Sequence, residues 1–117
     1  MAEKKYTKEH EWVEVDGDTA TVGITNHAQE SLGDIVFIDL PTVGKEVKSN
    51  EELCVIEPVK AASDIYAPID GEVIEINNNL NEDASIVNQD PEKDGWIFKM
   101  KIADPSQYNN LMTLDEY

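Results

Sequence analysis

The sequence predicts a mostly β fold, a sandwich or small barrel, on three observations. Residues 95–102 alternate apolar and polar side chains with a period of two, the pattern of a strand with one buried face. Short extended runs bounded by proline and glycine recur along the chain, as is typical of such folds. At 117 residues and 40% hydrophobic side chains, the chain has room for one domain, 1–117, with a modest core.

The first two strands are expected to form a hairpin. Residues 11–15 and 19–24 are extended runs, and the second alternates apolar and polar side chains. The connection between them contains Gly17, which can adopt the positive φ that a tight reversal needs. Both strands therefore belong to one antiparallel pair.

A short helix and four further strands follow in the predicted order. Asn26 can cap a helix over residues 26–32, with Gln29 as its capping-box partner and Gly33 at its end. The next extended runs, each bounded by turn residues, are residues 35–40, 52–57, 63–67 and 72–77.

A last strand and a C-terminal helix complete the order. The period of two over residues 95–102 sets Lys99 and Lys101 against an apolar face made of Trp96, Phe98, Met100 and Ile102. Asp104 followed by Pro105 favours a helix start, so we expect a helix near 104–112 that packs against the sheet.

The charge of the chain excludes some classes of partner. Its 25 acidic residues against nine lysines, with no arginine, give a net charge of −16, which repels phosphate backbones. Nucleic acid is therefore not an expected partner. No run approaches the roughly 20 apolar residues of a membrane helix, and the start at Met1 has no signal region, so we expect a soluble protein without membrane contact. Its expected compartment is the bacterial cytoplasm, or the mitochondrial matrix for the mature form of a eukaryotic protein.

Cysteine and histidine are interpreted as structural residues. Cys54 lies in an apolar run without a second cysteine, which favours a core residue over a redox group. His10 and His27 lack the spacing of metal ligands, so no metal site is predicted. No set of residues with the pattern of a catalytic site stands out.

Lys60 is the best candidate for a functional residue. It is the only lysine from Ser49 through Glu92, a stretch with eleven acidic residues. It lies between the extended runs 52–57 and 63–67, at or beside a hairpin tip, where partner proteins have access. An exposed amine with acidic neighbours is a poor Schiff-base catalyst, because that role needs burial or a second cation. A site of covalent attachment fits better, against the default of an ordinary solvated lysine.

The segment from Glu57 to Asp64, with the sequence EPVKAASD, resembles the lipoylation site of glycine cleavage system H proteins. Further similar segments follow the family order from about Tyr6 to Tyr117. These segments are residues 8–13, 22–29, 32–37, 40–44, 68–77, 87–91 and 94–96. One such motif is weakly specific, whereas this many in the right order is highly specific.

The resemblance implies a fold and a cofactor. The fold would be the barrel-sandwich hybrid of lipoyl and biotinyl carriers, with Lys60 on an exposed hairpin. Lipoic acid joined to the Lys60 amine as an amide would give a long arm that ends in a dithiolane ring. The chain would then be a monomeric carrier subunit without catalytic activity of its own.

The resemblance also implies a set of partners. A pyridoxal-phosphate glycine decarboxylase would load an aminomethyl group onto the lipoyl arm. A tetrahydrofolate-dependent aminomethyltransferase would take that group, and dihydrolipoyl dehydrogenase would reoxidise the arm. A lipoate-attaching enzyme would modify Lys60 beforehand.

Two acidic residues match family positions that help to hold the loaded arm in a surface cleft. These are Glu11 and Asp64, and a carboxylate can pair with the protonated amine of the carried group. The alternative is that both are ordinary solvated acids.

Three residues depart from the family pattern. Pro58 stands where the family usually has serine, and it removes one N–H from the hairpin. The turn is therefore expected to be stiffer or to lack its last hydrogen bond. Ala84 and Glu92 stand where many relatives have proline and tyrosine, which predicts a more polar loop over residues 81–94.

Two other functions remain open from the sequence. The first is a biotin carrier or the lipoyl domain of a 2-oxo acid dehydrogenase, and it is less favoured. Val59 and Ala61 replace the methionines that flank the lysine of biotin carriers, and both kinds of module are shorter than this chain. An H-like protein that relays lipoate to other acceptor proteins, or binds a partner without glycine turnover, would have the same sequence features.

Overall fold

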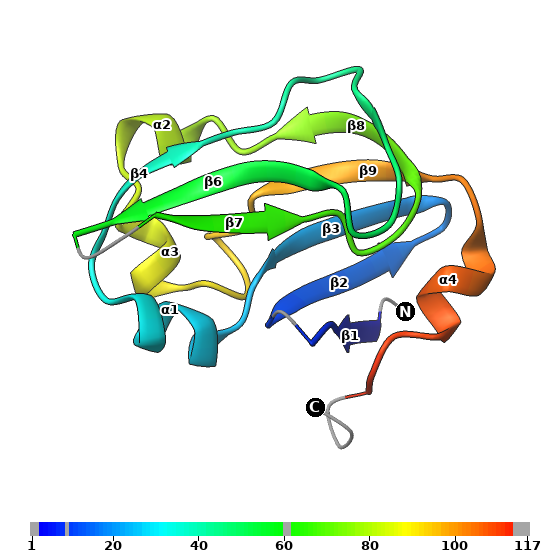
Figure 1. Cartoon of the computed structure of the whole chain (residues 1–117), viewed down its shortest axis with the longest axis horizontal. Helices are drawn as coiled ribbons and strands as arrows, with labels where there is room; N and C mark the ends of the chain where they lie inside the picture. Colours follow the sequence, from blue (N-terminus) through cyan, green and yellow to red (C-terminus); the bar gives the residue numbers. More distant parts are fainter. Residues whose placement is uncertain (1–2, 9, 60–61, 114–117) are drawn as a thin grey trace.

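The computed structural model describes residues 3–8, 10–59 and 62–113, and it shows two β-sheets with short helices at the ends (Figure 1). The larger sheet has the strand order β1-β2-β3-β9-β8-β5, and the smaller has the order β4-β6-β7. Every pairing is antiparallel. The predicted mostly β architecture is therefore confirmed.

The bounds of the strands are β1 Glu3–Tyr6, β2 Glu11–Asp16, β3 Thr19–Ile24, β4 Ile35–Asp39, β5 Glu46–Val47, β6 Glu52–Pro58, β7 Ser63–Tyr66, β8 Gly71–Ile76 and β9 Phe98–Ile102. The helices are α1 Asn26–Leu32, α2 Asn79–Glu82, α3 Ile86–Gln89 and α4 Pro105–Asn109. In Figure 1, α1, α2 and α3 gather at one end of the molecule and α4 lies at the other. Within the described residues, none of these helices has the length and apolar character needed to span a membrane.

Most predicted strands are confirmed to within a few residues. Gly17 has φ 67°, as the predicted turn between β2 and β3 requires. The sequence did not predict β1, β5, α2 or α3. A two-residue strand and single-turn helices are too short to show a period in the sequence.

Both predicted helices form: α1 has the predicted bounds with a different N-cap, and α4 is shorter than predicted. Thr25, and not Asn26, caps α1, because its hydroxyl accepts a hydrogen bond from the Ala28 amide at 3.2 Å. The C-terminal helix stops at Asn109 and does not reach residue 112. Met112 instead pairs with Tyr6 through two backbone hydrogen bonds of 2.7 and 2.9 Å.

The strand predicted over residues 95–102 begins only at Phe98. Phe98 and Met100 are fully buried, as expected. Trp96 was assigned to that same face, and this was wrong. Its ring lies 5.0 Å beneath the Lys99 amine, while Ile97 is buried in its place. The alternation therefore fails where the chain enters the strand from the loop.

Trp12 packs tightly against β3. It is 1% exposed, and its indole N–H donates to the Pro91 carbonyl at 2.9 Å. Gly23 lies directly opposite on β3, where an added Cβ would lie 2.8 Å from the indole ring. The Lys4 amine covers the ring at 4.8 Å. Only glycine fits opposite Trp12 without displacing it.

We expect Gly23→Ala to lower the free energy of unfolding by about 1–3 kcal/mol, because the indole must move from a packed site. Urea unfolding followed by tryptophan fluorescence measures this change. Ser31→Ala, at an exposed position of α1, serves as the control. Equal unfolding midpoints for the two variants would contradict the prediction.

Candidate functional site

The β6–β7 hairpin reaches one end of the molecule (Figure 1). Ile56 pairs with Ser63, so the chain reverses within the connection 59–62. Lys60 lies outside the described residues, within this connection. Val59 beside it is 71% exposed. The predicted hairpin is thus confirmed on both sides of Lys60.

A short segment before β4 holds the outer end of the hairpin. The Val59 amide donates to the Asp34 carbonyl at 3.0 Å. The Asn88 side chain fixes the residues on either side of Asp34, since its Nδ2 donates to the Gly33 carbonyl at 2.8 Å and its Oδ1 accepts from the Ile35 amide at 2.9 Å. The position next to Lys60 is therefore tied to the body of the protein through Asn88.

Glu11 is buried and links the two sheets. It is 1% exposed, which excludes the reading of Glu11 as a solvated acid. Its Oε1 accepts from the Thr7 hydroxyl at 3.1 Å, and its Oε2 accepts from the Tyr66 amide at 2.9 Å. Because Glu11 begins β2 and Tyr66 ends β7, the carboxylate bridges the larger sheet and the strand that leads away from Lys60.

A cavity of about 260 Å³ adjoins Glu11. Glu11 is the one carboxylate among the described residues that line it. The other lining residues are of mixed character, namely Tyr6, Thr7, Lys8, Ser49, Asn50, Ala67, Pro68, Asn110, Leu111 and Met112. A positively charged ligand group in this cavity would meet a buried carboxylate.

Asp64 lies on the surface of β7, two residues before Tyr66. It is exposed, pairs across the strand with Val55, and does not line the Glu11 cavity. At about 3.3 Å per residue, the two positions on β7 are roughly 7 Å apart. The structure brings Glu11 to β7 but leaves Asp64 on the outer face of that strand.

Comparisons with known proteins fit this geometry. A family model described as glycine cleavage H-protein matches residues 4–117. The chain is 52% identical over 117 residues to the glycine cleavage system H protein of Thermotoga maritima, covering all of this chain and 94% of that protein. The chain belongs to the glycine cleavage H-protein family. The H protein of Vibrio campbellii is 53% identical over 114 residues, with 97% and 90% covered.

A solved structure supports the same family. The crystal structure of a glycine cleavage system H protein from Mycobacterium marinum matches with a TM-score of 0.86 and 34% identity, covering 98% of this chain and 93% of that one. The resemblance found in the sequence is therefore confirmed, together with the barrel-sandwich fold. The two sheets of this H-protein family member face each other without closing into one barrel.

Pro58 is accommodated at the end of β6, the central strand of the smaller sheet. It is buried at the end of β6, opposite Ile35. The register between β4 and β6 shifts between Ile35 and Phe37, and such irregular positions tolerate the missing N–H of proline. The next amide, that of Val59, restores a hydrogen bond to the segment before β4.

The loop over residues 81–94 differs from expectation. Ala84 is buried in the core, so it does not make the surface more polar. Glu92 makes specific contacts, since its carbonyl accepts from the Lys4 amine at 2.7 Å and its carboxylate accepts from the Asn26 amide at 3.3 Å. These bonds fix the loop against β1 and the start of α1.

Cys54 is a core residue, as the sequence predicted. Burial raises the pKa of its thiol well above the ordinary range, and the nearby charges of Glu11 and Asp39 raise it further. Since the thiolate is the reactive form, this thiol is inert at neutral pH. It therefore does not compete in disulfide exchange with a cofactor.

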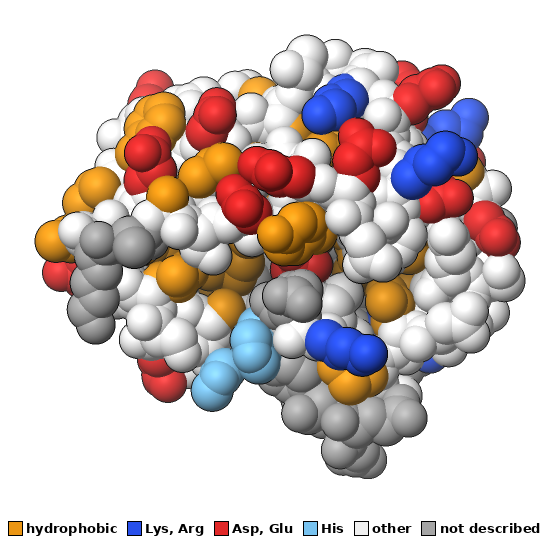
Figure 2. All heavy atoms as spheres, viewed as in Figure 1, with side chains coloured by type: hydrophobic (Ala, Val, Ile, Leu, Met, Phe, Trp, Pro, Cys, Tyr) orange, Lys and Arg blue, Asp and Glu red, His pale blue; other side chains and the backbone are white. Residues whose placement is uncertain are grey.

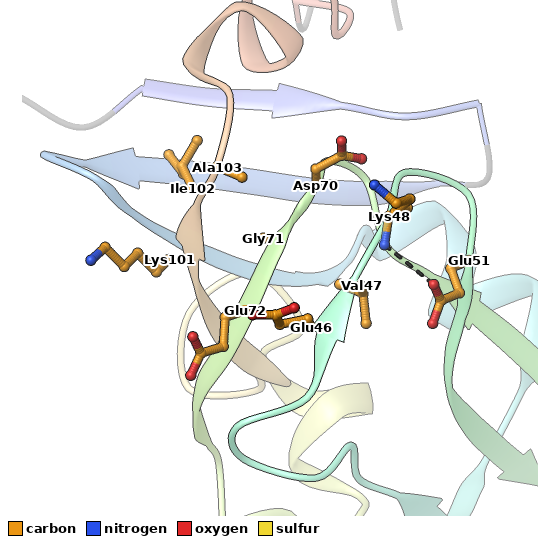
Figure 3. Close-up of a pocket in the computed structure, with 10 residues that line it drawn as sticks. All are labelled: Glu46, Val47, Lys48, Glu51, Asp70, Gly71, Glu72, Lys101, Ile102 and Ala103. Carbon is orange, nitrogen blue, oxygen red and sulfur yellow. Dashed lines mark hydrogen bonds between the residues drawn. The ribbon is translucent and has the colours of Figure 1, made fainter.

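A second cavity lies elsewhere in the structure. It has a volume of about 520 Å³ and is bounded by β5, β8 and the end of β9, with amines and carboxylates mixed around its rim (Figure 3). Its Asp70 accepts a hydrogen bond from the Ser49 amide at 2.6 Å, which lowers the pKa of that carboxyl. We assign the site to the smaller cavity, because only that one contains the buried Glu11 beside β7.

We expect Asn88→Ala to loosen the outer end of the hairpin. The change removes the partners of the Gly33 carbonyl and the Ile35 amide, a loss of about 1–3 kcal/mol in the free energy of unfolding. Hydrogen exchange measured by NMR should also show faster exchange of the Val59 amide. Asn81→Ala, at an exposed position of α2, is the control. Unchanged protection of the Val59 amide would show that Asn88 does not hold the hairpin.

Proposed function

We propose that this chain carries a lipoyl group on Lys60 and shuttles an aminomethyl group between the enzymes of glycine cleavage. One observation supports this proposal. The β6–β7 hairpin, whose connection contains Lys60, reaches one end of the molecule, and the buried carboxylate of Glu11 lies beside a cavity at the other end of β7. One strand therefore connects the attachment point with a shelter for the cargo. Family membership makes the chain a carrier without catalytic activity.

The residues present fit a lipoyl amide at this position. When bound, the group supplies a disulfide: glycine loses carbon dioxide, its remaining carbon bonds to one sulfur, and the other sulfur becomes a thiol. Extended chain from Ala62 to Tyr66 spans about 13 Å, so an arm that follows β7 to the Glu11 cavity needs at least this reach. The exposure of Val59 leaves the hairpin end open to solvent and to other proteins.

Glu11 is proposed to hold the amine of the carried group. A carboxylate can accept about four hydrogen bonds, so its bonds to Thr7 and Tyr66 are compatible with binding an ammonium group. Those bonds also fix the carboxylate in place before the cargo arrives. Asp64, exposed between the hairpin and Tyr66, is proposed to attract the amine along the same strand.

The proposed partners are glycine decarboxylase, the tetrahydrofolate-dependent aminomethyltransferase, dihydrolipoyl dehydrogenase and a lipoate-attaching enzyme. We propose that the chain acts as a monomer in the cytoplasm, in keeping with its bacterial relatives. A lipoate relay to other acceptor proteins needs the same modified lysine, but no feature of the described residues favours it.

Lipoylation is the first test of this function. Intact-mass analysis after incubation with lipoate, ATP and a lipoate ligase should show one lipoyl group on the wild-type chain and none on Lys60→Arg. No mass gain, or an equal gain in Lys60→Arg, would contradict the assignment. Glycine–bicarbonate exchange after addition of the decarboxylase then distinguishes glycine cleavage from relay.

The role of Glu11 is tested by Glu11→Gln, which preserves the shape and an acceptor for the Tyr66 amide but removes the charge. We expect full lipoylation, with loss of the loaded aminomethyl group at least about tenfold faster, because a hydrogen bond to a charged group contributes about 1.5–3 kcal/mol. The lifetime of the loaded form is followed by mass spectrometry. Glu30→Gln, at an exposed site on α1, is the control. Equal lifetimes in the wild type and Glu11→Gln would exclude Glu11 as the holder.

A further inference from the structure

Three exposed apolar side chains lie beside the hairpin. Val36 and Phe37 on β4 are 63% and 48% exposed, and Val59 is 71% exposed. We call these three residues the hairpin patch. The irregular register between Ile35 and Phe37 explains why two successive residues of β4 both face solvent. Large exposed apolar side chains grouped in this way are typical of interaction sites.

The hairpin patch includes Val59, the residue directly before Lys60 in the sequence. Phe37 lies opposite Glu57, which is three residues before Lys60 in the sequence. The Val59 amide is bound to the Asp34 carbonyl, two residues before Val36. An enzyme that reaches an arm on Lys60 therefore approaches over these side chains.

The charge around the patch has one sign. The strands β4, β6 and β7 contain no lysine, and six acidic residues on or next to them are exposed, namely Asp34, Asp39, Glu51, Glu52, Glu57 and Asp64. Figure 2 shows hydrophobic and acidic side chains intermixed over this sheet, with the lysines drawn in blue away from the hairpin end. The complementary partner surface is an apolar contact bordered by lysine or arginine.

We propose that the hairpin patch is the docking surface for glycine decarboxylase, an inference that rests on the proposed function. The decarboxylase would contribute an apolar contact bordered by basic residues. The decarboxylase meets the arm before loading, when the arm has no ammonium group to pair with Glu11. An arm without an ammonium group gains no ion pair with Glu11 in the cavity. The decarboxylase therefore meets it at the hairpin end. Phe37 and Val36 are the anchors of this contact, and the acidic rim steers the approach.

Binding of the chain without lipoate to the decarboxylase tests this directly, with isothermal titration calorimetry as the readout. The double variant Val36→Ser/Phe37→Ser should bind at least about tenfold more weakly than the wild type. The matched control is Val43→Ser/Ile74→Ser, which removes two exposed apolar side chains near β8 in the larger sheet. The control should bind like the wild type.

A second pair of variants tests the charge without touching apolar packing. Glu57→Lys should weaken binding and reduce its dependence on salt, whereas Glu46→Lys on β5 should do neither. Unchanged affinity for the decarboxylase in both Val36→Ser/Phe37→Ser and Glu57→Lys would overturn the proposal. So would control variants that lose as much affinity as the variants of the patch. Slower lipoylation with unchanged decarboxylase binding would also overturn it. A wild-type chain that gains no lipoyl group would instead refute the proposed function, a separate outcome.

Discussion

The antiparallel pairing of β6 with β7, fixed at its outer end by the hydrogen bond from the Val59 amide to the Asp34 carbonyl, is the constraint on which the site depends. It holds both ends of the connection that contains Lys60 at one end of the molecule. Asn88 on α3 holds Asp34 in position, because its side chain is hydrogen-bonded to the residues on both sides of Asp34. The described residues on either side of this connection, Val59 and Ala62, are both exposed.

The second organising feature is the buried carboxylate of Glu11. Burying a charged group is unfavourable unless hydrogen bonds compensate, and here Thr7 and Tyr66 provide them. The same bonds connect the two sheets and face a cavity on the strand that leads from Lys60. A single side chain thus combines a structural link with the charge that we propose binds a protonated cargo. Its charge also contributes to keeping the Cys54 thiol inert.

Local patterns in the sequence predicted the features that depend on local interactions. Alternation predicted the main strands, and the isolated Lys60 between two extended runs predicted the hairpin, while the motif order indicated the family. The burial of Glu11 was not predictable from the residues alone, because its partner Tyr66 is 55 positions away. Trp96 was misplaced because the periodic pattern continues past the point where β9 begins. The exposed pair on β4 follows from a register shift that only the pairing with β6 reveals.

The central claim is that the cargo moves from the hairpin to Glu11 along β7. The most direct measurement is the backbone amide NMR signal of Tyr66, the donor to the Glu11 carboxylate, in the unmodified, lipoylated and aminomethyl-loaded forms. The account predicts a small change on lipoylation and a large shift on loading, because only the loaded arm brings an ammonium group to Glu11. A Tyr66 signal that is the same in the lipoylated and loaded forms would contradict it.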